Sequence, residues 1–175
     1  MIRLVKPTIK YKTTFLEAQK EFEPEGRADN KLKELNGDFS AYVKILRNQE
    51  KGKELPAGYV SATVYWLIDG NKFIGKASVR HKLTKVLRLW GGHIGYEIRP
   101  SERKKGYGSK ILALSLKKAK KLGIKKVFVT CNEDNLGSKK IIEKNGGVFI
   151  GKVKVKVGKD AKKIKLRYWI NNENS

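Results

Sequence analysis

The stretch of sequence at positions 95–108 reads Gly95-Tyr96-Glu97-Ile98-Arg99-Pro100-Ser101-Glu102-Arg103-Lys104-Lys105-Gly106-Tyr107-Gly108. It begins as a strand that a proline ends, and it runs into a segment with helical periodicity. Gly106 and Gly108 lie in the connecting loop, where glycine allows successive N–H groups to turn toward one point. The N-terminus of the following helix adds partial positive charge. The loop therefore predicts a pyrophosphate site, and three adjacent cations reinforce it: Arg103, Lys104 and Lys105.

Other phosphate-binding loops do not match this stretch. A dinucleotide fingerprint needs a third glycine after Gly108, but Leu112 stands in the next turn, and there is no Gly-Lys-Ser/Thr sequence. Taken alone, the two glycines are equally consistent with a simple turn into a helix. The rest of the chain must decide between these interpretations.

Periodicity predicts the elements on either side. The helix after the loop is the clearest; it begins near Tyr107 or Gly108 and has Gly123 as its C-cap candidate. Asp69-Gly70-Asn71 forms the turn of a predicted hairpin. The expected strands are 2–5, 59–68, 73–79, 93–99, 127–130, 148–157 and 163–170, and the other expected helices are 15–22, 38–46 and 136–144. This order predicts an α/β fold with a mixed sheet, in a single domain over residues 1–175.

Composition limits the classes of protein. The 175 residues carry 40 Lys plus Arg against 17 Asp plus Glu, a formal charge of +23. Only eight of these cations are arginine, and the lysines lie in scattered pairs, which favours a solvated surface over a nucleic-acid interface. The single cysteine, Cys131, excludes an intramolecular disulfide, and no Cys/His cluster has zinc spacing. No secretory signal or membrane span is visible, so we expect a cytoplasmic protein.

The loop and its surroundings together resemble one family. Arg103-Lys104-Lys105-Gly106-Tyr107-Gly108 is similar to the Arg/Gln-x-x-Gly-x-Gly/Ala signature of the GCN5-related N-acetyltransferase (GNAT) superfamily. The segment 135–147, Asn-Leu-Gly-Ser-Lys-Lys-Ile-Ile-Glu-Lys-Asn-Gly-Gly, resembles the family's Asn-x-x-Ala/Ser…Glu-Lys-x-Gly segment. Gly91 to Pro100, with a terminal Arg167-Tyr168-Trp169-Ile170, is similar to a bacterial subgroup of predicted acetyltransferases.

The resemblance implies a fold and a co-substrate. The fold would be a mostly antiparallel sheet flanked by helices, with a splayed strand pair forming a cleft for acetyl-CoA. No metal is implied. Loop N–H groups would hold the CoA pyrophosphate, and the strand before the loop would pair with the pantetheine arm. The implied cofactor-binding residues are Ile98, Arg99, Arg103, Lys104, Lys105, Gly106, Tyr107, Gly108, Asn135 and Ser138.

The implied reaction is direct attack of a primary amine on the thioester in a ternary complex. The amine must lose a proton, and Glu97 is the first candidate base, because strand alternation puts it with His93 on the face opposite Ile94. His93 is the second candidate. The alternatives are that Glu97 only pairs with a nearby cation and that His93 only binds a loop carbonyl.

The general acid is less clear. Family members commonly carry tyrosine where this chain has Ile142, which cannot donate a proton. Tyr107, Cys131 or Tyr168 would have to donate instead, or the thiolate leaves unassisted. Cys131 also suggests an acetyl-cysteine intermediate, but it has no evident base partner and is better read as a buried strand residue.

Three functions remain open from the sequence. The first is an N-acetyltransferase for a small-molecule or peptide amine, and no motif identifies this acceptor. The second is a CoA-binding regulatory protein without catalysis, which the substitution at Ile142 would suit. The third is a basic nucleic-acid-binding module, which rests on charge alone and is disfavoured. Membrane association is not expected, and dimers are common in the family, so a homodimer is one expectation.

Overall fold

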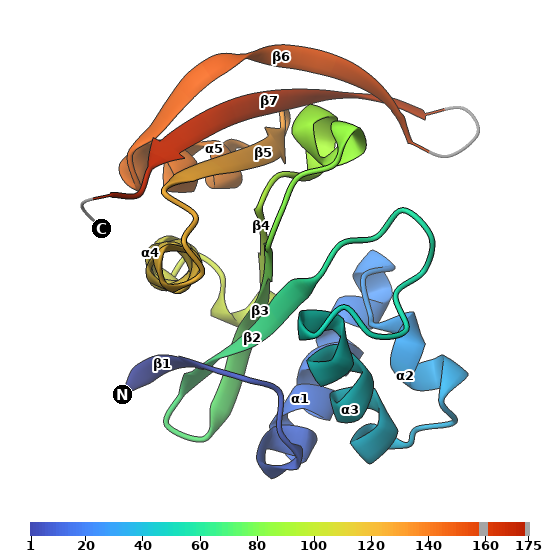
Figure 1. Cartoon of the computed structure of the whole chain (residues 1–175). Helices are drawn as coiled ribbons and strands as arrows, with labels where there is room; N and C mark the ends of the chain where they lie inside the picture. The colour runs from blue at the N-terminus through green and yellow to red at the C-terminus, as the bar shows by residue number, and fades with distance from the viewer. Residues whose placement is uncertain (158–160, 174–175) are drawn as a thin grey trace.

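The computed structural model describes residues 1–157 and 161–173. Strands β1 to β4 precede the signature loop, and β5 to β7 follow the helix after it (Figure 1). The strands are β1 (Ile2–Val5), β2 (Ala62–Asp69), β3 (Lys72–Arg80), β4 (Ile94–Ile98), β5 (Lys126–Asn132), β6 (Gly147–Val157) and β7 (Ala161–Asn171). The α-helices are α1 (Lys12–Phe22), α2 (Asn30–Glu34), α3 (Phe39–Glu50), α4 (Tyr107–Lys121) and α5 (Leu136–Lys144).

The strands form two antiparallel sheets. One has the order β1-β2-β3-β4 and the other β5-β7-β6. Helices α1 and α3 contact one face of the first sheet, and α4 contacts the other (Figure 1). This α/β architecture of antiparallel sheets flanked by helices confirms the expected fold class.

The two sheets meet where β4 begins. The His93 N–H donates to the Phe128 carbonyl oxygen at 2.7 Å, and the Phe128 N–H donates to His93 Nδ1 at 2.9 Å. An imidazole nitrogen thus takes the place of the backbone acceptor that would continue a strand ladder. Past this point β4 and β5 belong to different sheets and a cleft separates them.

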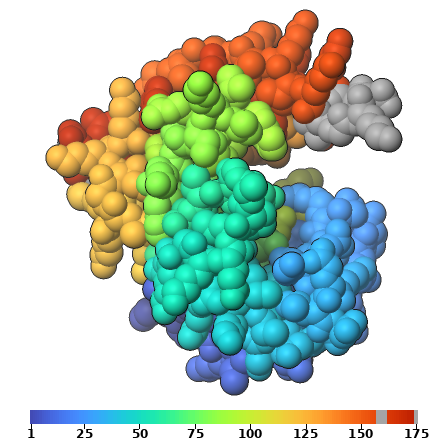
Figure 2. Space-filling view, turned by 45° about the vertical axis from the view of Figure 1, so that its right-hand side comes forward, coloured from blue at the N-terminus to red at the C-terminus, as the bar shows by residue number. Residues whose placement is uncertain are grey.

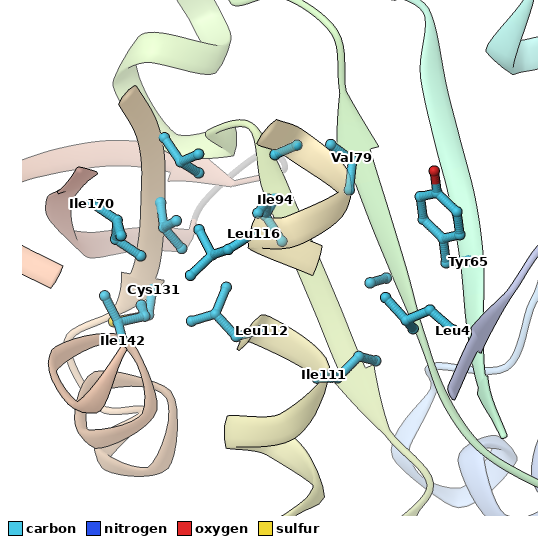
Figure 3. Close-up of a cluster of buried hydrophobic side chains, with 14 of the residues drawn as sticks. Leu4, Tyr65, Val79, Ile94, Ile111, Leu112, Leu116, Cys131, Ile142 and Ile170 are labelled. Atoms are coloured by element: carbon cyan, nitrogen blue, oxygen red, sulfur yellow. The ribbon is translucent and has the colours of Figure 1, made fainter. Parts of the chain in front are cut away.

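Strand β2 divides the interior into two cores because its side chains alternate between the faces of the sheet. Trp66 and Ile68 join the aromatic core under the N-terminal helices, built around Phe15, Phe39, Tyr42 and Phe73. Leu67 faces the other way, into the α4 core, which also contains Ile94, Ile111, Leu112, Leu116, Cys131, Ile142 and Ile170 (Figure 3). The first sheet therefore carries a packed layer on each side.

The observed strands and α-helices follow the predicted ones with one additional α-helix, and short 3₁₀ and π-helical turns lie between them. Helix α4 begins at Tyr107, and Gly123 beyond its end has a φ of 77°, as the C-cap prediction required. The short helix α2 was not expected, because its five residues bury only Leu32 and so show no apolar period. The π-helical turn at Leu87–Gly91 was not expected either, and it buries none of its residues.

Candidate active site

The loop between β4 and α4 presents backbone N–H groups. Lys104 has a φ of 62° and Gly106 a φ of 83°, and these left-handed residues turn the chain into α4. The Arg103 N–H donates to the Pro100 carbonyl and is therefore already used. In the described part of the chain, the N–H groups of residues 104–109 meet no acceptor. Such a row at a helix N-terminus is suited to an anionic group.

The arginines of this stretch point away from the loop toward the N-terminal helices. The Arg103 guanidinium binds Glu25 through both terminal nitrogens, at 2.6 and 2.7 Å, and its Nε donates to the Ile98 carbonyl. Buried Arg99 donates through Nε to Glu21 at 2.7 Å. Their charges are therefore compensated by carboxylates nearly 80 residues away in the chain. Lys104 and Lys105 are the exposed cations of the loop, and the Lys105 ammonium lies 3.1 Å from the buried Glu102 carboxylate.

The start of α4 is fixed by two further contacts. The Tyr107 hydroxyl donates to Asp69, the last residue of β2, at 2.9 Å. A Cβ on Gly108 would lie 2.5 Å from Cδ1 of Ile141, so glycine at this position permits α4 and α5 to pack closely. The second glycine of the motif thus serves helix packing, while the left-handed Gly106 shapes the loop.

The cleft between β4 and β5 has a volume of about 250 Å³. It is lined by Arg80, Trp90, Gly91, Ile94, Gly95, Tyr96, Thr130, Cys131, Asn132, Asn135, Ser138 and Lys165. The side-chain oxygen of Asn132 is buried and meets no hydrogen-bond donor in the described residues. A buried amide oxygen without a partner is costly, so this atom suits a ligand that brings an N–H group.

The N-terminus of α5 closes one side of this cleft. Asn135 caps the helix, and its side-chain oxygen accepts the Ser138 N–H at 2.9 Å. The Ser138 hydroxyl lies 2.9 Å from the Tyr96 hydroxyl. Tyr96 thus reaches from β4 across the cleft to α5, and burial raises its pKa to about 12.

A second cavity lies between the first sheet and the N-terminal helices, with a volume of about 300 Å³. It is lined by Asp29, Tyr42, Leu46, Val64, Lys76, Ala77, Ser78, Arg80, Gly95, Tyr96 and Glu97. Figure 2 shows the surface hollowed between the N-terminal helices and the β6–β7 hairpin. Arg80, Gly95 and Tyr96 line both this cavity and the cleft, so the two spaces meet at these residues.

The charged groups of the second cavity are paired with one another. Lys76 lies 3.1 Å from both Asp29 and Glu97, and Arg27 lies 3.0 Å from the other oxygen of Glu97. Tyr42 donates to Asp29 at 2.6 Å. Burial opposes ionisation of Asp29, but the Lys76 ammonium and these hydrogen bonds outweigh it and lower its pKa. Both carboxylates of the cavity are therefore held by cations.

His93 lies between β4 and β5 and is 8% exposed. The expectation that it points with Glu97 into the second cavity is wrong, because the imidazole turns to the Phe128 N–H. Burial, together with the positive charges of Arg88 and Arg80, lowers its pKa to about 4. The imidazole is neutral at pH 7, and its acceptor nitrogen is engaged, an arrangement that favours a structural role.

The candidate acids named from the sequence lie in different surroundings. Ile142 is fully buried in the α4 core (Figure 3). Cys131 is a buried residue of the same core, and burial raises its pKa. Tyr168 is buried beside Glu143, and burial raises its pKa to about 12. The Tyr107 hydroxyl is bound to Asp69.

Sequence reasoning missed four residues where the cavities meet or adjoin: Asp29, Lys76, Arg80 and Tyr96. Tyr96 could have been found, because it stands inside the signature strand. The alternation pattern assigned it to the core face, and only the splay of β4 from β5 opens that face to a cleft. Asp29, Lys76 and Arg80 belong to no motif, and tertiary packing brings them together.

The chain matches one protein family. The family model described as "Acetyltransferase (GNAT) domain" matches residues 28–148. This match covers more than half of the chain, which therefore belongs to the GNAT acetyltransferase family. The resemblance noted from the loop is confirmed, and with it the class of enzyme, an acetyl-CoA-dependent acyltransferase. No curated protein sequence matches the chain.

Solved structures share the fold at low sequence identity. RimJ of Mycobacterium smegmatis, in complex with a CoA disulfide, has a TM-score of 0.72 at 16% identity, over 99% of this chain and 83% of that one. The microcin C7 self-immunity acetyltransferase MccE, with acetyl-CoA and AMP, has a TM-score of 0.71 at 14% identity, over 97% and 92%. A chimera of spermidine N-acetyltransferase SpeG from Vibrio cholerae and hSSAT has a TM-score of 0.66 at 13% identity, over 99% and 96%.

Two kinds of feature are absent from the described residues. None of their helices combines the length and the apolar character that a membrane crossing requires. Within residues 1–157 and 161–173, no group of three or more His, Cys, Asp or Glu side chains is arranged to hold a metal ion.

Proposed function

We propose that the whole chain works as one cytoplasmic N-acetyltransferase domain, in which a primary amine attacks acetyl-CoA directly in a ternary complex. The observation that carries this is the meeting of two cavities at Arg80, Gly95 and Tyr96. The β4–β5 cleft would admit the thioester from one side of the sheet, and the cavity under the N-terminal helices would admit the amine from the other. Two substrates held at one junction need no covalent enzyme intermediate.

The coenzyme would be held mainly by backbone. Residues 104–109 offer their unused N–H groups to the pyrophosphate, with Lys104 and Lys105 beside them. The N–H of Arg99 pairs with Ile74 on β3, so strand alternation turns the N–H groups of Tyr96 and Ile98 toward the cleft. These groups suit the pantetheine carbonyls and the oxyanion. The orphaned oxygen of Asn132 suits a pantetheine amide N–H.

The acceptor would be a small molecule or peptide end with one amine to present. Asp29 and Glu97 are already held by Lys76 and Arg27, so the cavity offers no uncommitted carboxylate for a second ammonium group. Arg80, which lines the same space, donates to the carbonyls of Gly91 and Gly92. These charges favour an acceptor that is not a polycation.

The first test is binding of the coenzyme. With acetyl-CoA or CoA at about 100 times its Kd, we expect roughly 2.7 kcal/mol of stabilisation. For a chain of this size that is a rise in Tm of about 5–10 °C, measured by thermal shift. A short generic oligonucleotide serves as the control polyanion and should give no comparable shift. If neither CoA species raised Tm, the proposed function would be refuted; if only the oligonucleotide did, the nucleic-acid alternative would replace it.

Glu97 is the base in this proposal, because it lies in the amine cavity next to Tyr96 on β4. For Glu97→Gln we expect a loss in kcat of roughly 100-fold, within the usual range for a general base, with the Kd for CoA unchanged. The assay follows thiol release from acetyl-CoA over a panel of amines. The loss should shrink at higher pH, where the free amine is already deprotonated.

Glu50→Gln is the matched control, since it also removes a glutamate–lysine ion pair, with Lys6 at 2.7 Å, but lies outside the cavity. Its turnover should equal that of the parent enzyme. If Glu97→Gln also kept full turnover, Glu97 would only order β4 through its ion pairs. If the parent enzyme bound CoA but acetylated no amine, the regulatory alternative would be favoured.

A further inference from the structure

Tyr96 joins the two halves of the site. Tyr96 lines both the β4–β5 cleft, which would hold the thioester, and the cavity under the N-terminal helices, which would hold the amine. Its hydroxyl lies 2.9 Å from the Ser138 hydroxyl on α5. The side chain itself packs beside the α4 core, on the side of β4 that faces the cleft. The phenol therefore borders the cleft beside the N-terminus of α5, on the side where the thioester would enter under the proposed function.

The residues that the sequence offered as general acids, and the isoleucine at the family's tyrosine position, are less well placed. Ile142 has no polar atom and is buried in the α4 core. The Tyr107 hydroxyl is committed to Asp69 beside the β2–β3 turn, and the Tyr168 hydroxyl faces Glu143. Cys131 lines the cleft, but its thiol is a weak donor. Among the described residues, Tyr96 is the only tyrosine that lines the cleft.

We propose that Tyr96 is a catalytic residue that donates a hydrogen bond from its phenol O–H to the departing CoA sulfur. In this arrangement the Ser138 hydroxyl donates to the phenol oxygen and orients it, leaving the phenol hydrogen for the sulfur. When the tetrahedral carbon collapses, its C–S bond breaks and both bonding electrons move to sulfur. The sulfur leaves as a thiolate, and it takes its proton from water after release.

The protonation of Tyr96 supports this role. Burial raises its pKa to about 12, so the phenol keeps its proton at all working pH values. A free thiol has a pKa of about 8.5, so full transfer of the phenol proton to the thiolate would be unfavourable. A retained hydrogen bond to a charged sulfur avoids this transfer and still stabilises the transition state. This inference rests on the proposed function, because it assumes turnover of acetyl-CoA.

The test is Tyr96→Phe, which removes one oxygen atom. We expect kcat to fall about 30-fold, in the range for loss of one donor to a charged atom, with KM for acetyl-CoA within two-fold of the parent enzyme. Thiol release is measured with the amine that gives parental turnover and with water as the only nucleophile. Because selenolate is a better leaving group than thiolate, acetyl-seleno-CoA should reduce the loss to a few-fold.

The matched control is Tyr168→Phe, which also removes a buried phenol oxygen but lies in the α4 core; it should keep parental kcat. Ser138→Ala should give an intermediate loss, because the phenol remains but is not oriented. Tyr96→Phe with kcat within two-fold of the parent enzyme would overturn the proposal. An equal loss with the sulfur and selenium esters would also overturn it, by showing a structural effect. Failure of the parent enzyme to bind CoA would instead refute the proposed function.

Discussion

Gly92→Ala is expected to lower the free energy of unfolding by about 4 kcal/mol and to weaken CoA binding. Gly92 has φ 68° and ψ −179°, a conformation that is essentially restricted to glycine and costs other residues about 1–3 kcal/mol. A Cβ here would also lie 2.6 Å from the Phe128 carbonyl oxygen. That oxygen accepts the His93 N–H, so it cannot move without opening the junction of the two sheets.

Urea unfolding of the parent protein and of Gly92→Ala measures this loss, and the Kd for CoA is measured for both in parallel. Gly58→Ala is the control: Gly58 also has a positive φ, of 81°, but a Cβ there would have no neighbour within 4 Å. We expect it to cost only about 1 kcal/mol, the ordinary penalty for a left-handed alanine. Equal losses in the two variants would show that the junction tolerates the extra carbon.

Acidification from pH 7 to pH 5 is expected to remove about 2 kcal/mol of stability through His93 alone. Its pKa is about 4 in the folded protein and about 6.5 when unfolded, so in this window the unfolded chain binds more protons. The stabilisation by neutral His93 is therefore complete above pH 6.5 and is lost as the pH falls toward 4. The total loss is roughly 3 kcal/mol. Protonation also puts a hydrogen on Nδ1, which can then no longer accept the Phe128 N–H.

Denaturant unfolding at several pH values between 7 and 5 measures this slope. His93→Gln, with an amide oxygen in place of the imidazole acceptor, should flatten it, while His81→Gln should leave it intact. His81 is the other histidine of the chain and lies 2.9 Å from the Thr63 hydroxyl. Carboxylates with lowered pKa, such as Asp29, titrate below this window. An unchanged slope in His93→Gln would contradict the assignment.

The fold could be predicted from the sequence because its signals are local. The strand, the two-glycine loop and the amphipathic helix from Tyr107 lie within 30 residues, and the structure has them in that order. Helix α2 was missed because a single buried residue gives no period. The family could be recognised from residues 103–108 and 135–147. These segments carry a local signal because their residues set the backbone conformation of the loop and cap a helix.

The site was harder to predict because its charges are arranged by long-range contacts. Arg103 was expected to reinforce the positive field at the pyrophosphate, but Glu25 binds its guanidinium from 78 residues away. His93 was a candidate base because strand alternation puts it on the same face as Glu97, whereas its side chain in the structure completes the junction with β5. No pattern within one segment records such pairings. The roles of the cofactor loop, Glu97 and Tyr96 remain predictions for the experiments above.

The division of the interior by β2 has a consequence for how this enzyme can evolve. Trp66 and Leu67 are neighbours in sequence but are buried in separate cores, one under the N-terminal helices and one under α4. Mutations in distant, separately packed regions combine almost independently. Under the proposed function, substitutions inside the aromatic core can therefore alter the acceptor cavity while the α4 core stays intact, as long as Glu21 and Glu25 keep their ion pairs with Arg99 and Arg103. A change of acceptor would then require repacking of one core only.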